Sequence, residues 1–232
     1  MRTATKLVTT AVATGAACVA YGTFIERHWY RLRRVVLPKA LRRAGRLSIL
    51  HLSDLHLIPG QDHRMRFLAS LADLSHDLVV VTGDLLGDEG AESMAVEALA
   101  PLTSKDRPGL VVLGSNDLFG PTVKSPLAYF TKPERRVHGA VLDTPALIAG
   151  LEEHGYHTIR NSTAVIQTRA GEIGVGGIDD PHLKATVLPA ASEVTPPPGG
   201  DDRVLDLGLV HSPYLAALDI LVDAGHELLL AG

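Results

Sequence analysis

Four short apolar runs, each stopped by glycine or polar residues, constrain most strongly what this chain can fold into. They are residues 48–52 (SILHL), 78–82 (LVVVT), 109–114 (GLVVLG) and 204–210 (VLDLGLV). Runs that are apolar almost throughout indicate strands covered on both faces. Helical patterns lie between them over 62–74 and over about 90–100, and a third follows the last run from Ser212 to Ala224. The alternation predicts an α/β fold.

The C-terminal half adds further elements to this pattern. Thr144, followed by proline, predicts a helix start with the threonine as cap, and Gly155 predicts the end of that helix. The runs 163–168 and 172–177 predict a β-hairpin, and 227–232 predicts a final strand.

A long irregular stretch lies between the third apolar run and Thr144. It carries Pro121, Pro126 and Pro133 and is too long for a simple connection. We therefore expect it to line a functional site.

The charge balance and the cysteine content limit the chemistry available to the chain. A net charge of −4 and a pI near 6.2 give no reason to expect nucleic acid as a partner. Cys18 is the only cysteine, which excludes a disulfide framework and a thiolate metal site. Any bound metal must be held by histidine, aspartate, glutamate or asparagine.

Residues 7–24 contain no charged side chain over 18 positions, which is just enough to cross a bilayer. The segment also suits a secretory signal, and a buried or disordered helix is a third interpretation. More arginines follow it than precede it, which favours a cytoplasmic domain if the segment stays as an anchor, with export still open. The same arginines could lie along anionic head groups. We predict an anchor or signal segment (1–30), a basic linker (31–46) and one domain (47–232).

Polar residues recur just beyond the carboxyl end of each apolar run. The four groups are Ser53-Asp54-Leu55-His56, Gly83-Asp84, Gly114-Ser115-Asn116-Asp117 and His211-Ser212-Pro213. Each alone is also typical of a strand-ending turn. In open α/β sheets, functional sites lie at the carboxyl ends of the strands. Gly83 and Gly114 allow the backbone to turn sharply there. Because every group offers a ligand that hard cations accept, the four together predict a divalent metal site.

The motifs D-x-H, G-D, a variant of G-N-[HD] and a strand-end histidine, in this order, resemble the calcineurin-like metallophosphoesterase superfamily. The resemblance runs from about Leu47 to Gly232, and a bacterial, membrane-associated branch looks most similar. It implies a sandwich of two mixed β-sheets flanked by helices. It also implies metal ligands, with Asp54 and His56 on the first ion, Asp84 bridging both, and Asn116 and His211 on the second.

The same resemblance implies the reaction. Two divalent ions (Mn, Fe or Zn) about 3.5–4 Å apart would hold a bridging hydroxide that attacks the phosphorus of a phosphate ester. The apolar N-terminal segment makes a lipid-linked or envelope-derived ester an attractive substrate. The alternative is an inactive protein of the same fold that serves as a binding scaffold.

The third motif departs from the family pattern, Gly-Asn-His followed by Asp or Glu. Aligned without a gap, Ser115 takes the ligand position. A shift of one residue makes Asn116 the ligand, which we favour because an amide oxygen is the better ligand for a divalent ion. The leaving-group histidine is absent either way, and Asp117 could act as the general acid only with a raised pKa.

The family's last motif, Gly-His-x-His, normally follows a short apolar strand and supplies one ligand to each ion. Here such a strand ends at Gly232. We therefore expect a chain that is incomplete at its C-terminus, with a weak second metal site and impaired hydrolysis. Residues 179–182 (DDPH) predict either a turn or a substrate-side lining, and Tyr214 is expected in the core.

Overall fold

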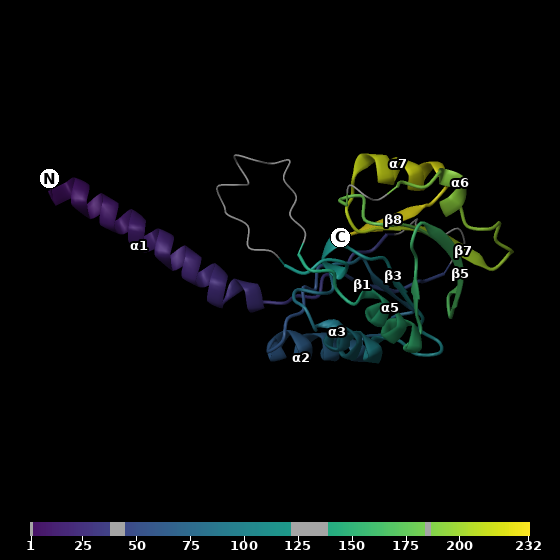
Figure 1. Ribbon diagram of the computed structural model, residues 1–232, viewed down its shortest axis with the longest axis horizontal. Helices are drawn as coiled ribbons and strands as arrows, with labels where there is room; N and C mark the ends of the chain where they lie inside the picture. The colour runs from purple at the N-terminus through teal and green to yellow at the C-terminus, as the bar shows by residue number, and fades with distance from the viewer. Residues whose placement is uncertain (1, 38–44, 122–138, 184–186) are drawn as a thin grey trace.

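The computed structural model describes residues 2–37, 45–121, 139–183 and 187–232. Figure 1 shows a long helix, α1, extending away from a body made of two sheets with helices on their outer faces. Helix α1 spans Arg2–Phe24 and is followed by a short 3-10 helix, η1 (Glu26–His28). Pro126 and Pro133 of the predicted site-lining loop lie outside the described residues.

The first sheet contains four parallel strands in the order β1-β2-β3-β4. The strands are β1 (Ile49–Leu52), β2 (Leu78–Val81), β3 (Gly109–Val111) and β4 (Tyr156–Thr158). The helices of this half are α2 (Asp62–Ser70), α3 (Glu92–Leu99) and α5 (Thr144–Glu153), with the 3-10 turns η2 (Leu71–Asp73), η3 (Ala100–Leu102) and η4 (Ser115–Asp117). Each connection crosses over the sheet, so neighbouring strands run in the same direction.

The second sheet has the order β5-β6-β7-β8. Its strands are β5 (Ser162–Thr168), β6 (Gly171–Ile178), β7 (Arg203–Val210) and β8 (Leu228–Ala231), and its helices are α6 (Ala191–Val194) and α7 (Leu215–Asp223). Strands β5 and β6 form an antiparallel hairpin, whereas β6, β7 and β8 are parallel.

Alternate residues along the central strands pack in opposite directions, as strand geometry requires. Val80 and Leu110 of the first sheet pack between the sheets with Leu207 and Leu209 of β7. Val79 and Val81, with others of the same register, pack under α3 and α5 instead. The strands are therefore buried on both faces, which is why their sequences are apolar throughout.

The predicted α/β sandwich of two sheets flanked by helices is confirmed. The first sheet is wholly parallel where the structure describes it, not mixed as expected, because helical crossovers join its strands. The cap of α5 is Asp143, whose carboxylate accepts from the N–H of Ala146 at 3.1 Å, and not Thr144. Tyr214 is 42% exposed, so its expected place in the core was wrong.

Candidate metal centre

The carboxyl ends of β1, β2 and β7 bring together three of the predicted ligands. Asp54 follows β1, Asp84 follows β2 and His211 follows β7. One ligand atom of each lies within 4.8 Å of the others. The first two come from the parallel sheet and the third from the second sheet, so the site spans the sandwich.

The loop that carries Asp54 and His56 and the loop that carries Asp84 have an uncommon backbone conformation at these residues. Asp54, His56 and Asp84 have φ values of 54°, 40° and 54°, and they are three of the four non-glycine residues with positive φ in the described ranges. Residues other than glycine adopt this left-handed region uncommonly, with Asn, Asp and His doing so more often than the rest, and residues in this region cluster at functional sites. Two hydrogen bonds hold the loops together, from Asp54 N to Gly83 O (3.0 Å) and from His56 N to Asp84 O (2.9 Å).

Asp84 lies at the centre of the group and is 6% exposed. Its Oδ2 atom is 3.5 Å from Nε2 of His211 and 3.7 Å from Nε2 of His56. Asn116 donates to both carboxylate oxygens, from its backbone N–H at 2.9 Å and from Nδ2 at 2.6 Å. Burial raises the pKa of Asp84, but the contacts with His211 and Asn116 outweigh burial and hold that pKa below its ordinary value. The carboxylate is therefore ionised at neutral pH.

His211 is held in one orientation by its second ring nitrogen. Nδ1 lies 2.6 Å from the carbonyl oxygen of Thr82 and donates to it, which leaves Nε2 facing Asp84. This is the arrangement in which a backbone acceptor orients a ligating imidazole. Burial lowers the pKa of His211, but the Asp84 carboxylate outweighs burial and raises that pKa to about 9.

Asp54 and His56 form the open side of the group. Their side chains are 46% and 44% exposed, whereas those of Asp84 and His211 are 8% and 9% exposed. Nε2 of His56 lies 3.8 Å from Oδ1 of Asp54, and Ser53 Oγ donates to Oδ2 of Asp54 at 2.5 Å. A ligand can therefore approach from the side of Asp54 and His56.

Two glycines allow the loops to approach this closely. A Cβ atom on Gly83, where φ is +87°, would lie 2.5 Å from the backbone nitrogen of Gly114. A Cβ atom on Gly114 would lie 2.2 Å from Oδ1 of Asp84. The role that the sequence suggested for these glycines matches this geometry.

Asp117 has a different position from the one its predicted role requires. It is fully buried, and its carboxylate accepts from the backbone N–H groups of Asp84, Leu85, Leu86 and Gly114 at 2.7–3.1 Å. Burial raises its pKa to about 6 despite these four donors. A carboxylate enclosed in this way positions the Asp84 loop and cannot reach a leaving group. The structure therefore does not support Asp117 as the general acid.

Asn116 is the residue of its motif that donates hydrogen bonds to the Asp84 carboxylate, and the described contacts of that carboxylate do not include Ser115. Arg64 of α2 is a functional neighbour that the sequence did not reveal. It donates to the carbonyl oxygens of Leu55 and His56, the second at 3.0 Å, and so supports the loop that carries Asp54 and His56. Arg64 is eight residues beyond His56 in the chain and belongs to no recognisable sequence pattern, because only the tertiary fold brings its side chain to this loop.

The residues 179–182 form a turn, one of the two predicted alternatives. Asp180 is buried and accepts from the backbone N–H of His182 at 2.9 Å and from Ser212 Oγ at 2.6 Å. Ser212 follows His211, so this turn supports the His211 loop. Gly232 also adjoins the site, since its N–H donates to the carbonyl oxygen of His211 at 2.8 Å.

Of the comparisons with known proteins, the family model is the informative one. No curated protein matches the chain. Among solved structures, a protein of unknown function from Aquifex aeolicus matches with a TM-score of 0.27 and 11% identity, over 60% of this chain and 66% of its own. The family model for calcineurin-like phosphoesterases matches residues 47–173, which include Asp54, His56, Asp84 and Asn116. The chain belongs to the calcineurin-like phosphoesterase family.

Proposed function

We propose that this protein hydrolyses phosphate esters at a binuclear metal centre formed by Asp54, His56, Asp84, Asn116 and His211. The grouping of Asp54, Asp84 and His211 donor atoms within 4.8 Å carries the proposal. When bound, divalent ions held by these residues would supply an activated hydroxide and would offset the charge of the phosphoryl oxygens.

The residues present fit such ions. Carboxylate oxygens and imidazole nitrogens suit Mn²⁺, Fe and Zn²⁺. Ligand atoms about 2.0–2.2 Å from one ion lie roughly 3–4 Å from each other, and Asp84 Oδ2 lies 3.5 and 3.7 Å from the two imidazole nitrogens. Asn116 presents Nδ2 to Asp84, so half a turn about its Cβ–Cγ bond would present the amide oxygen instead.

Each residue has a distinct task in this proposal. Asp84 is buried and ionised, so it offers one carboxylate to both ions. His211 offers Nε2 because Thr82 holds Nδ1. Asp54 and His56 are half exposed, so the phosphate ester would enter beside them. A lipid-linked ester stays a prediction, based on α1 alone.

The test replaces the central carboxylate. Asp84→Asn should lower Mn²⁺-dependent hydrolysis of bis-p-nitrophenyl phosphate at least a hundredfold, because removing one such ligand costs about 3 kcal/mol or more. Bound metal, measured by elemental analysis, should fall with it. Asp106→Asn is the matched control, since Asp106 is exposed and precedes β3 at the opposite end of the strands. Full activity in Asp84→Asn would contradict the proposal.

One observation favours a second candidate, an inactive binding scaffold. Asp117 cannot act as the leaving-group acid, because it is fully buried beneath the site. The scaffold predicts bound metal with no hydrolysis above background, even for esters whose leaving groups need no protonation. Hydrolysis of bis-p-nitrophenyl phosphate that disappears in Asp84→Asn would exclude it.

A further inference from the structure

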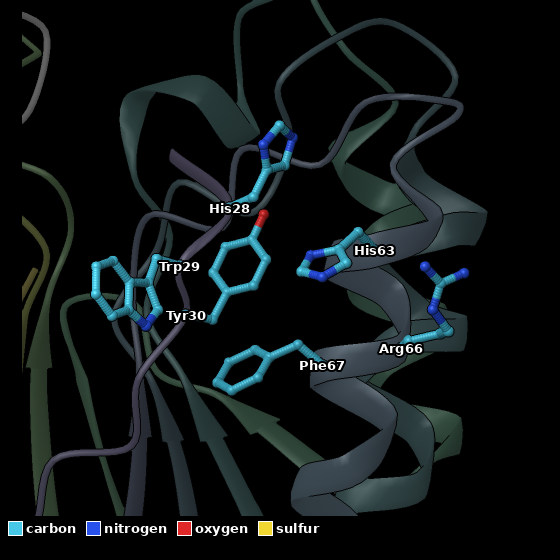
Figure 2. Close-up of a pocket in the computed structure, with 6 residues that line it drawn as sticks. All are labelled: His28, Trp29, Tyr30, His63, Arg66 and Phe67. Carbon is cyan, nitrogen blue, oxygen red and sulfur yellow. The ribbon is translucent and has the colours of Figure 1, made fainter. Parts of the chain in front are cut away.

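The segment that follows α1 lies against α2. Figure 2 shows Tyr30 facing His63 and Phe67, two residues one turn apart on that helix. The Tyr30 and Phe67 rings stack with centroids 5.0 Å apart, and the Tyr30 and His63 rings are 5.6 Å apart. Tyr30 Oη also accepts from Nε of Arg64 at 3.1 Å. We name residues 25–37 the strap.

The strap and α2 border an open, shallow cavity of about 410 Å³. Its lining is aromatic and cationic, and consists of His28, Trp29, Tyr30, His63, Arg66 and Phe67 (Figure 2). Next to it, the guanidinium of Arg31 lies 4.1 Å from the centroid of the Trp29 ring. Guanidinium groups pair with phosphate oxygens through two parallel hydrogen bonds, so the chemistry of this lining suits a phosphate group.

The strap also exposes a series of apolar side chains to solvent. Ile25, Trp29, Leu32, Val35, Val36 and Leu37 are 45–84% exposed. Arginines lie among them at positions 31, 33 and 34, and Arg66 of α2 adds a fourth positive charge. The acidic residues Glu26 and Asp62 offset two of these four charges. A surface that is both apolar and basic suits the boundary between the acyl chains and the anionic head groups of a membrane. A soluble anion would pair with the arginines but would leave the apolar side chains exposed to water.

Helix α1 ends just before this surface. Thr5–Phe24 is the one helix in the described residues that is long and apolar enough to cross a membrane, and none of it is buried. Tryptophan and tyrosine concentrate at the interface of a bilayer, and Trp29 and Tyr30 would lie there if α1 crosses it.

We propose that the strap and α2 form a docking surface for an anionic membrane, and that the cavity beside Arg66 takes the phosphate of an anionic phospholipid head group. Apolar side chains of the strap enter the bilayer interface, while the arginines pair with lipid phosphates. The proposal is independent of any hydrolytic activity.

Trp29 is the only tryptophan, so its fluorescence reports on this site in the full chain. With the protein in dodecyl maltoside micelles, dihexanoyl phosphatidylglycerol should shift the Trp29 emission saturably, and dihexanoyl phosphatidylcholine should need at least tenfold more. Arg66→Gln should weaken phosphatidylglycerol binding about tenfold, the effect of losing roughly 1.4 kcal/mol. Lys105→Gln removes one exposed charge remote from the strap and should change nothing.

Three outcomes would overturn the proposal. Equal responses to the two lipids would mean that the head-group charge is not recognised. Unchanged lipid binding in Arg66→Gln, with a wild-type circular dichroism spectrum, would exclude the cavity as the phosphate site. Saturation by inorganic phosphate at the concentration effective for the lipid would indicate a site for a soluble anion and not a membrane.

Discussion

At the scale of single residues, His211 and Asp84 form an ion pair in the metal-free protein. The folded pKa of His211 is about 9 and its usual value is 6.5, so the pair stabilises the fold fully below pH 6.5 and loses this contribution as pH rises to 9. The folded pKa of Asp84 is lowered, so its contribution is present above its usual value near 3.8 and is lost only in stronger acid.

We therefore expect the metal-free protein to unfold at lower urea concentration at pH 9.5 than at pH 6.5. Urea denaturation with a chelator present measures this difference. In His211→Gln the decline over this range should be smaller. An identical decline in that variant would show that other groups cause it.

Metal binding should have the opposite dependence on pH. An ion must displace the proton of His211, so the affinity for Mn²⁺ should rise about tenfold between pH 7 and pH 8. Titration calorimetry in buffers of different ionisation enthalpy would also count the released proton.

Asp117 allows a test that separates a positioning role from catalysis. Asp117→Asn keeps one acceptor oxygen but turns an N–H₂ group toward backbone donors, which should cost about 3 kcal/mol of unfolding free energy. Hydrolysis of p-nitrophenyl and of phenyl esters should then fall by the same factor, together with metal affinity. A general acid would instead affect mainly the phenyl ester, whose leaving group needs a proton. A loss of activity confined to the phenyl ester in Asp117→Asn would instead support Asp117 as the general acid.

Residue types at strand ends allowed the grouping of Asp54, Asp84 and His211 to be predicted, whereas the contacts around the candidate ligands could not be predicted. Asp54, His56, Asp84, Asn116 and His211 were each recognisable because a polar residue interrupts an apolar run. The Asp117 carboxylate accepts from backbone N–H groups of a loop more than 25 residues earlier in the chain. Contacts between residues so far apart in the chain cannot be predicted from a local sequence pattern.

At the scale of elements, the apolar runs predicted five of the eight strands from their sequence, and the hairpin of β5 and β6 was equally clear. Strand β4 was missed because Tyr156–Thr158 is only three residues long and only Tyr156 is buried. The cap of α5 was misassigned because Asp143 and Thr144 are both good caps. Thr144 is occupied elsewhere, since its hydroxyl donates to the carbonyl oxygen of Asp117 at 2.6 Å.

The close approach of the β2 and β3 ends predicts the effect of one added methyl group. In Gly114→Ala, the new Cβ would lie 2.2 Å from Oδ1 and 2.7 Å from the backbone nitrogen of Asp84, so the loop must move. We expect a loss of about 1–3 kcal/mol in stability and weaker metal binding, measured by denaturation and calorimetry.

Gly120→Ala is the matched control in the same connection, because its nearest neighbour would be 3.4 Å away. Equal effects of the two substitutions would contradict the steric explanation.

At the scale of the whole molecule, labelling of Cys18, the only cysteine, tests whether α1 spans a membrane or is removed as a signal. If α1 crosses a bilayer, Cys18 lies within the span Thr5–Phe24 and should be shielded. A membrane-impermeant maleimide should then label the protein only after detergent is added. Labelling of intact membranes would contradict a spanning helix, and absence of Cys18 from the purified protein would identify a cleaved signal.

The hydrogen bond between His211 and Thr82 has a consequence for biosynthesis. It joins the two sheets through two residues that are 129 positions apart in the chain. Residues 49–158 of the first sheet leave the ribosome before His211 is synthesised, and a domain generally folds as a unit. The group of Asp54, Asp84 and His211 can therefore form only after the second sheet has been synthesised and has packed against the first. A metal ion that requires all three side chains would bind after that step, which makes its incorporation a late event in the production of the protein.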